Sequence, residues 1–355
     1  MCLMLLFSAK MITLAIFFVA MPLCVTFIGS VVTIKFAILT SMFICVMDAL
    51  HLCNCAVLFL PVLVLLLIVP VNVIPTFAMS LYSFFLGLSG LLTAFLEPYA
   101  ITSLSMLYSQ KLVDESLQWP TFNKGIILAI TVTCYTASVK LGFLLLFQGE
   151  AMLYWPILCI VVLAILIGTA SIIKDEGIIS DAAVITVGMF WFISTLSTEN
   201  SIKTQFQITD QRHLISIDDA GTSILAYFWI FTNSVISFAD FGKLLLGYYL
   251  SGMFLLQVFI RISSFLYMLS IIMQYVQESP MVTVDKKLSS FPNILQILIT
   301  IFAYTELLLT VAVNIRSDIN IPAWQLRFFI SNRSIKVTQA LSLAIIYLWR
   351  MANVD

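Results

Sequence analysis

Apolar runs long enough to cross a bilayer, separated by short polar stretches, follow one another along the whole chain. The run from Cys55 to Phe77 has 23 residues without a charge, and 16 of them are Val, Leu, Ile or Phe. A helix of this length covers about 34 Å, more than the roughly 30 Å of a bilayer's hydrocarbon core. Pro61, Pro70 and Pro75 are compatible with this helix, because neighbouring helices in lipid can satisfy the carbonyls that proline leaves free. The run therefore predicts a membrane span.

The same pattern predicts an all-α fold: a polytopic integral membrane protein with roughly nine to ten transmembrane helices. We expect a single transmembrane helical domain over residues 1–355, because no stretch is left that could form a soluble domain of ordinary size. The run 243–276 is one long tilted helix or two short ones. The apolar stretches that supply the spans are 11–32, 35–50, 55–77, 78–96, 125–148, 151–173, 178–196, 221–239, 243–276, 289–315 and 334–351.

Three connections between the predicted spans are polar enough to stand out. The first begins at Glu97-Pro98, where a span is expected to end, and the second covers 198–220. The third, 316–336, has a clear excess of positive charge, so the positive-inside rule places it in the cytosol. The end of the chain at Asp355 then lies on the opposite side of the membrane. The charges of this third connection are Arg316, Arg327, Arg333 and Lys336 against Asp318.

Composition agrees with a membrane protein and narrows its partners. The 355 residues are 61% apolar and 10% charged, whereas soluble domains are about 45–50% apolar and about 25% charged. A formal net charge of −1 gives no indication of a nucleic-acid partner, and the expected partner is the lipid bilayer. The seven cysteines lie mostly inside apolar runs, where their spacing predicts no disulfide framework.

Four ionisable residues lie inside predicted spans and are the candidate functional residues: Asp48, Lys140, Arg261 and Glu306. An isolated charge at mid-bilayer costs about 2.5–3.5 kcal/mol, so each should find a partner or water. Lys140 with Glu306 and Arg261 with Glu306 are both chemically sensible pairs. Such residues are either a proton or ion relay or a buried pair that fixes how the helices pack, and both interpretations stay open.

No stretch of the chain predicts an enzyme. The sequence contains no Gly-x-Gly-Asp, Gly-x-Ser-x-Gly or His-Glu-x-x-His, and no glycine-rich loop that could hold a phosphate. His51, Cys53 and Cys55 offer three soft ligands, but a zinc site needs a fourth ligand in tight geometry. Two reduced cysteines at a helix start are the simpler interpretation. We therefore expect no catalytic, cofactor-binding or metal site.

Three stretches resemble the wolframin family, in the family's order and at similar spacing. The first, SIIKDEGIISDAAVITVGMFWFISTLST (171–198), has an Ala-Val-Ile-Thr run after an acidic residue. The second, ILQILITIFAYTELLLTVAV (294–313), has a Glu-Leu pair after an aromatic stretch, and its Glu306 matches an acidic residue of the family. The third is WQLRFFISNRSIKVTQALSLAIIYLWRM (324–351). Together they cover under a quarter of the chain.

This resemblance implies a non-enzymatic, multi-pass protein of the endoplasmic reticulum (ER) membrane, linked to ER calcium homeostasis and to regulation of the unfolded protein response. It corresponds to the family's multi-span core, so functions of the family's soluble regions are not carried over. Membrane proteins of the ER are the implied partners, and a homo-oligomer is left open. The alternative function is a secondary transporter or ion channel of unknown substrate, using Glu306, Lys140 and Arg261.

The predicted topology can be tested through Asn332-Arg333-Ser334, which fits the acceptor pattern for N-glycosylation. Because the connection 316–336 is predicted to face the cytosol, Asn332 should carry no glycan. A glycosidase that removes N-linked glycans should leave the electrophoretic mobility of the full chain unchanged, with Asn332→Gln as the control. A mobility shift that Asn332→Gln abolishes would place this connection in the lumen instead.

Overall fold

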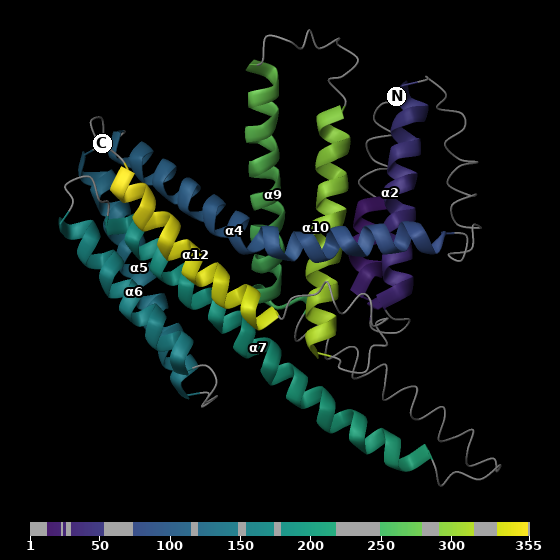
Figure 1. Ribbon diagram of the computed structural model, residues 1–355. Coiled ribbons are helices and arrows are strands. Elements are labelled where there is room, and N and C mark those ends of the chain that lie inside the picture. Colours follow the sequence, from purple (N-terminus) through teal and green to yellow (C-terminus); the bar gives the residue numbers. More distant parts are fainter. Residues whose placement is uncertain are drawn as a thin grey trace. The chain divides into compact units, whose positions relative to one another are not determined.

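The computed structural model describes ten stretches of the chain, and its regular structure in them is helical, without a strand. The stretches are 13–22, 24–25, 30–52, 74–114, 120–147, 154–173, 179–217, 249–278, 291–315 and 332–353. A short apolar helix, Thr13–Pro22, comes first. The longer helices are α2 (Ser30–Leu52), α4 (Thr76–Asp114), α5 (Pro120–Phe147), α6 (Tyr154–Ile173), α7 (Ile179–Ile217), α9 (Gly252–Glu278), α10 (Phe291–Ile315) and α12 (Asn332–Asn353) (Figure 1).

Seven of these helices are long and apolar enough to cross a membrane, counted over the described stretches. They are α2, α4, α5, α6, α7, α9 and α10. Seven apolar helices of this length indicate an integral membrane protein. The expected nine to ten spans stay a prediction, because 221–239 and most of 55–77 lie outside the described residues. The helix α12 does form where the span 334–351 was predicted, but it is not among the seven.

The chain groups into two compact units, and each contains helices of membrane-spanning length. Unit 1 combines Met1–Ser89 with Ile202–Phe329, and unit 2 combines Gly90–Ser201 with Ile330–Asp355. The single domain expected over 1–355 stays a prediction.

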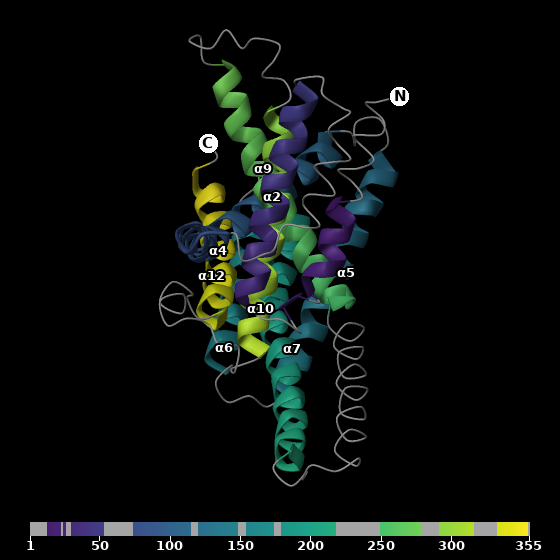
Figure 2. The same cartoon turned by 90° about the vertical axis from the view of Figure 1, so that its right-hand side faces the viewer.

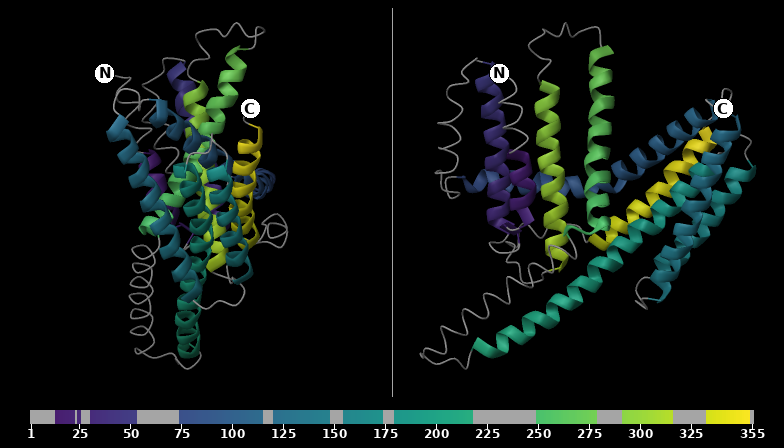
Figure 3. Two further views of the ribbon diagram at one scale, coloured as in Figure 1. Left: turned by 90° about the vertical axis from the view of Figure 1, so that its left-hand side faces the viewer. Right: turned by 180° about the vertical axis from the view of Figure 1, so that it is seen from behind.

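In unit 1, the helix α10 packs between α2 and α9. Two opposite views show this same order (Figures 1 and 3). The core between these helices is apolar and includes Phe43 of α2 and Leu308 of α10. The short first helix joins this core through Phe17, and the Tyr304 hydroxyl donates a hydrogen bond to the Phe18 carbonyl at 3.0 Å. The helix α10 therefore lies at the centre of the apolar core of unit 1.

In unit 2, the first part of α7 is the most enclosed helix. In its apolar stretch Ile179–Glu199, 78% of the residues are buried, compared with 6% of the residues in the apolar stretch of α5. The yellow helix α12 packs against α6 (Figure 1). Its buried face carries residues spaced three or four apart, which is the spacing that brings side chains onto one side of a helix. These residues are Lys336, Gln339, Leu343 and Tyr347.

The helices α5, α6 and α10 lie within a few residues of the predicted spans 125–148, 151–173 and 289–315. The predicted second span, 35–50, lies within α2. The first, 11–32, instead covers the short helix Thr13–Pro22 and the start of α2. Of the two interpretations of 243–276, the structure has one continuous helix from Gly252 onward, α9.

The predicted end of a span at Glu97-Pro98 is wrong, because α4 continues through Pro98 to Asp114. A proline inside a helix has no N–H to donate, and its ring clashes with the carbonyl four residues earlier. Here the helix around the proline is packed against others, and Glu97 is 1% exposed. Packing of this kind allows a helix to pass a proline inside a membrane protein.

The predicted polar loop 198–220 is also wrong over most of its length. The helix α7 runs without a break to Ile217, as the side view shows (Figure 2). Polar residues such as Gln, Lys and Glu have high helix propensity, so a polar segment can extend a helix that an apolar segment begins. Polarity alone therefore did not mark the end of the helix.

Gly188 offers a test of how α7 packs against α12 in unit 2. A Cβ atom at Gly188 would lie 2.9 Å from Cδ2 of Leu343, whose side chain is fully buried. Gly188→Val should therefore lower the free energy of unfolding by about 1–3 kcal/mol, the usual cost of overpacking. Thermal unfolding of the purified protein in detergent measures this. Gly125→Val is the matched control, because a Cβ at Gly125 meets nothing within 4 Å, and equal unfolding temperatures for both variants would contradict the packing.

Candidate functional site

The predicted residues Arg261 and Glu306 meet inside unit 1. Arg261 projects from α9 and Glu306 from α10, and each is 2% exposed. The Arg261 guanidinium donates through Nη1 to Oε2 of Glu306, forming a buried salt bridge. The Thr310 hydroxyl donates to the Glu306 backbone carbonyl at 2.8 Å and lies 3.2 Å from the second carboxylate oxygen. The carboxylate is therefore paired with the guanidinium and lies beside a hydroxyl of its own helix.

This geometry resolves which of the two sensible pairs forms. The partner of Glu306 is Arg261. Lys140 lies on α5 with its side chain exposed, seven residues before the helix ends at Phe147. That separation is about 10 Å, so the long lysine side chain can extend toward the membrane surface. Asp48, the fourth predicted residue, is 2% exposed on α2.

Unit 2 contains a second group of buried polar residues, and none of them is among the four predicted candidate residues. Gln339 of α12 donates its side-chain amide to Oε2 of Glu97 on α4 at 2.8 Å, and to the Thr93 carbonyl at 3.4 Å. The Lys336 ammonium lies 5.8 Å from the centre of the Phe192 ring on α7. Lys336, Glu97 and Gln339 are each at most 1% exposed. Hydrogen bonds and a cation–π contact thus connect α12 to α4 and α7.

Asp181 forms another polar contact in unit 2, at the start of α7. Its carboxylate accepts hydrogen bonds from the hydroxyls of Ser105, at 3.2 Å, and of Ser109. Ser109 also lies 3.2 Å from the Ser180 hydroxyl. A carboxylate in the first turn of a helix is favoured by the positive end of the helix dipole. These bonds fix the start of α7 against the last turns of α4.

Near the opposite end of α12, Arg350 contacts Tyr99 of α4. Its guanidinium donates to the tyrosine hydroxyl at 3.4 Å, and its Cζ lies 5.1 Å from the ring centre. Arg350 lies fourteen residues after Lys336 and near the same side of α12, since fourteen residues make close to four turns. Polar and cation–π contacts therefore occur near both ends of α12.

The signal for these residues was in their spacing. Glu97 follows Thr93 by four positions, and Lys336, Gln339 and Leu343 follow one another by three and four. The pattern places Lys336 in the predicted cytosolic connection and Glu97 at the end of a span, so it does not predict that either side chain is buried. Hydropathy averages all sides of a helix and does not show that its polar side faces inward.

The chemistry of both groups is that of charge pairing and hydrogen bonding. Over the stretches that the structure describes, no three His, Cys, Asp or Glu residues gather as metal ligands would. No family model, curated protein or solved structure matches this chain. The geometry of the buried polar residues is thus the main guide to what the protein does.

The buried pair makes a quantitative prediction. Arg261→Met leaves the Glu306 carboxylate buried without its cation, which typically costs about 3–5 kcal/mol. The unfolding temperature of the detergent-purified protein should fall accordingly. Removing both charges, in Arg261→Met with Glu306→Met, should restore most of the stability, because no uncompensated charge remains.

Lys140→Met is the matched control for Arg261→Met, since it makes the same change on an exposed side chain. Its effect on stability should be within about 0.5 kcal/mol, as for most surface substitutions. If Arg261→Met and Lys140→Met unfold at the same temperature, the salt bridge does not contribute as the structure implies.

Proposed function

We propose that this chain is a non-enzymatic, multi-pass membrane protein of the ER, of wolframin type, that acts in ER calcium homeostasis and in regulation of the unfolded protein response. Its partners are the lipid bilayer and other membrane proteins of the ER. The seven apolar helices and the resemblance of three segments to the wolframin family support this proposal.

The single observation that carries the proposal is where the resembling segments place five buried residues. The segment 171–198 contributes Asp181 and Phe192, and 294–313 contributes Glu306. The segment 324–351 contributes Lys336 and Gln339. All five residues bind or contact a neighbouring helix. The segments that resemble the family thus include residues that hold the helices together, as expected for a shared membrane core.

The geometry of Glu306 favours a structural role over an ion relay. A relay residue must exchange protons or ions with water, whereas the Glu306 carboxylate is buried and paired with the Arg261 guanidinium. The pair is 2% exposed on each side. Helices fixed in this way form a stable scaffold that other membrane proteins can bind, which agrees with a regulator rather than a catalyst.

One observation favours a second candidate function, transport of protons or ions. Unit 2 buries three acidic residues and a lysine, each at most 3% exposed: Glu97, Asp181, Glu199 and Lys336. Ionisable residues buried in membrane helices often mark such pathways. If the protein transports protons or ions, vesicles that contain it should show a proton or ion flux, and Glu97→Gln should lower that flux. The transport pathway would then use these four buried residues rather than Lys140.

Localisation together with topology tests the main proposal. The full chain with a C-terminal tag is expressed in cells. In one sample only the plasma membrane is permeabilised, and in another all membranes are. We expect the chain to coincide with ER markers, and the tag to be stained only after all membranes are opened. Residence in the plasma membrane, or a tag that is accessible from the cytosol, would contradict the proposal.

Calcium is the second measurement. Cells that express the chain should differ in ER calcium content, read with a luminal indicator, from cells without it. Cells that express the Arg261→Met variant are measured in parallel, because this variant lacks the buried salt bridge. Its location in the ER is checked by staining before its effect on calcium content is compared. An ER-resident protein that leaves both calcium content and the unfolded protein response unchanged would overturn the functional part of the proposal.

A further inference from the structure

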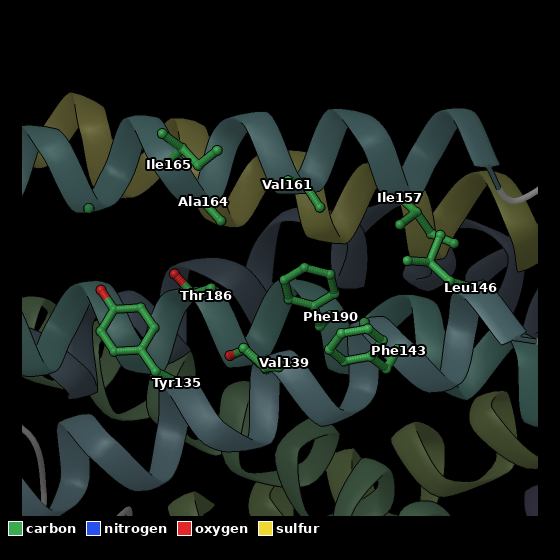
Figure 4. A pocket seen from close by; sticks show the side chains of 13 residues that line it. Tyr135, Val139, Phe143, Leu146, Ile157, Val161, Ala164, Ile165, Thr186 and Phe190 are labelled. Atoms are coloured by element: carbon green, nitrogen blue, oxygen red, sulfur yellow. The ribbon is translucent and has the colours of Figure 1, made fainter.

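An apolar groove runs along the helices α5, α6 and α7 within unit 2. Its volume is about 440 Å³. Figure 4 shows α5 and α6 as its two walls, with Tyr135, Val139 and Phe143 on one side and Ile165 and Val161 on the other. Thr186 and Phe190 of α7 lie behind them and form the floor. The wall residues Val139, Phe143 and Ile165 are more than half exposed, so the groove opens to the outside of the unit.

The groove presents almost no polar groups to a ligand. The Thr186 hydroxyl donates to the Ala182 carbonyl at 2.7 Å, and the Ser138 hydroxyl donates to the Cys134 carbonyl at 2.8 Å. Both hydroxyls are thus used by the backbone of their own helices. The Tyr135 hydroxyl lies at one end of the groove. A ligand for this site is therefore a hydrocarbon along nearly its whole length.

Two glycines create the space. A Cβ at Gly142 would lie 3.4 Å from the Phe190 ring, so this ring lies close to the glycine and forms part of the groove's floor. A Cβ at Gly168 would face the Tyr135 hydroxyl at 3.9 Å. Larger residues at either position would project into the groove. The width of the groove thus depends on Gly142 and Gly168.

The length of the groove matches half of a membrane. On α5 it extends from Tyr135 to Leu146, a separation of eleven residues or about 17 Å along the helix. Half of the hydrocarbon core of a bilayer is about 15 Å. Tyr135 also lies at the middle of the apolar stretch Phe122–Phe147, and Leu146 lies at its end. The groove therefore covers the depth of one leaflet, from its surface to the bilayer centre.

We propose that this groove binds one acyl chain of a membrane lipid. The lipid enters from the leaflet that contains the ends of α5 and α6 near Leu146 and Ile157, where its head group stays at the membrane surface. Its chain lies between α5 and α6 against Phe190, and its terminal methyl reaches Tyr135. The lining residues recognise the acyl chain by its shape and through apolar contacts.

The experiment uses the full chain in cell membranes supplied with a fatty acid that carries a photoactivatable diazirine near its methyl end. Cells incorporate the fatty acid into lipids, and after illumination the labelled peptides of the purified protein are identified by mass spectrometry. We expect labelling to concentrate on the groove, at Tyr135 and Gly168. Val132 and Leu166 are exposed on the same two helices, close to Tyr135 and Gly168 in height but outside the groove, and they report ordinary contact with lipid.

Gly168→Leu should reduce labelling of the groove about tenfold or more, because a leucine side chain takes the space of about four methylene groups. Gly142→Leu should do the same, and Gly125→Leu on α5 is the matched control that leaves the groove open. Gly168→Leu keeps the test valid if Gly142→Leu fails to fold. Labelling at the groove no stronger than at Val132, or unchanged in Gly168→Leu, would overturn the proposal. A cross-link to a second copy of the chain in place of lipid would do so as well.

Discussion

Inside a membrane, charged and polar side chains must find their partners within the protein, because no water is available. The rest of this structure depends on that constraint. In hydrocarbon, an unpaired charge costs several kcal/mol, whereas apolar side chains gain little by preferring each other to lipid tails. A few polar contacts can then decide which helices lie together and at what height. In unit 1 this contact is the salt bridge between Arg261 and Glu306, which connects the neighbouring helices α9 and α10.

Unit 2 meets the same constraint with α12, a helix whose polar residues face inward. Gln339 binds Glu97, and Lys336 contacts the Phe192 ring, while Ile345 and Trp349 are more than 60% exposed. The buried side of α12 therefore combines polar residues with apolar ones such as Leu343, while apolar side chains also cover its exposed side. The low mean hydropathy that keeps α12 out of the seven apolar helices thus arises from the residues that fix it to its neighbours. Small residues let the helices approach, as at Gly188 beside Leu343.

The sequence was sufficient for the features that depend on average polarity. Long apolar runs predicted α5, α6 and α10 within a few residues, and the intramembrane charges Arg261 and Glu306 were selected as a sensible pair. The choice between Arg261 and Lys140 needed the structure, because the pairing depends on which helices are neighbours. The same holds for Glu97 and Pro98, where a local sequence rule predicted a helix end that packing against other helices overrides. The buried polar side of α12 was missed because hydropathy does not distinguish the sides of a helix.

The register of α9 against α10 is the most direct consequence of this account. It can be measured in native membranes with pairs of cysteines, in a chain whose own cysteines have been replaced, and a short reagent that links two thiols. We expect Arg261→Cys with Glu306→Cys to cross-link within one chain. Phe259→Cys with Glu306→Cys should not, because Phe259 is two residues away on the opposite side of α9 and is 68% exposed. Equal cross-linking of both pairs, or of neither, would contradict the register in which positions 261 and 306 face each other across α9 and α10.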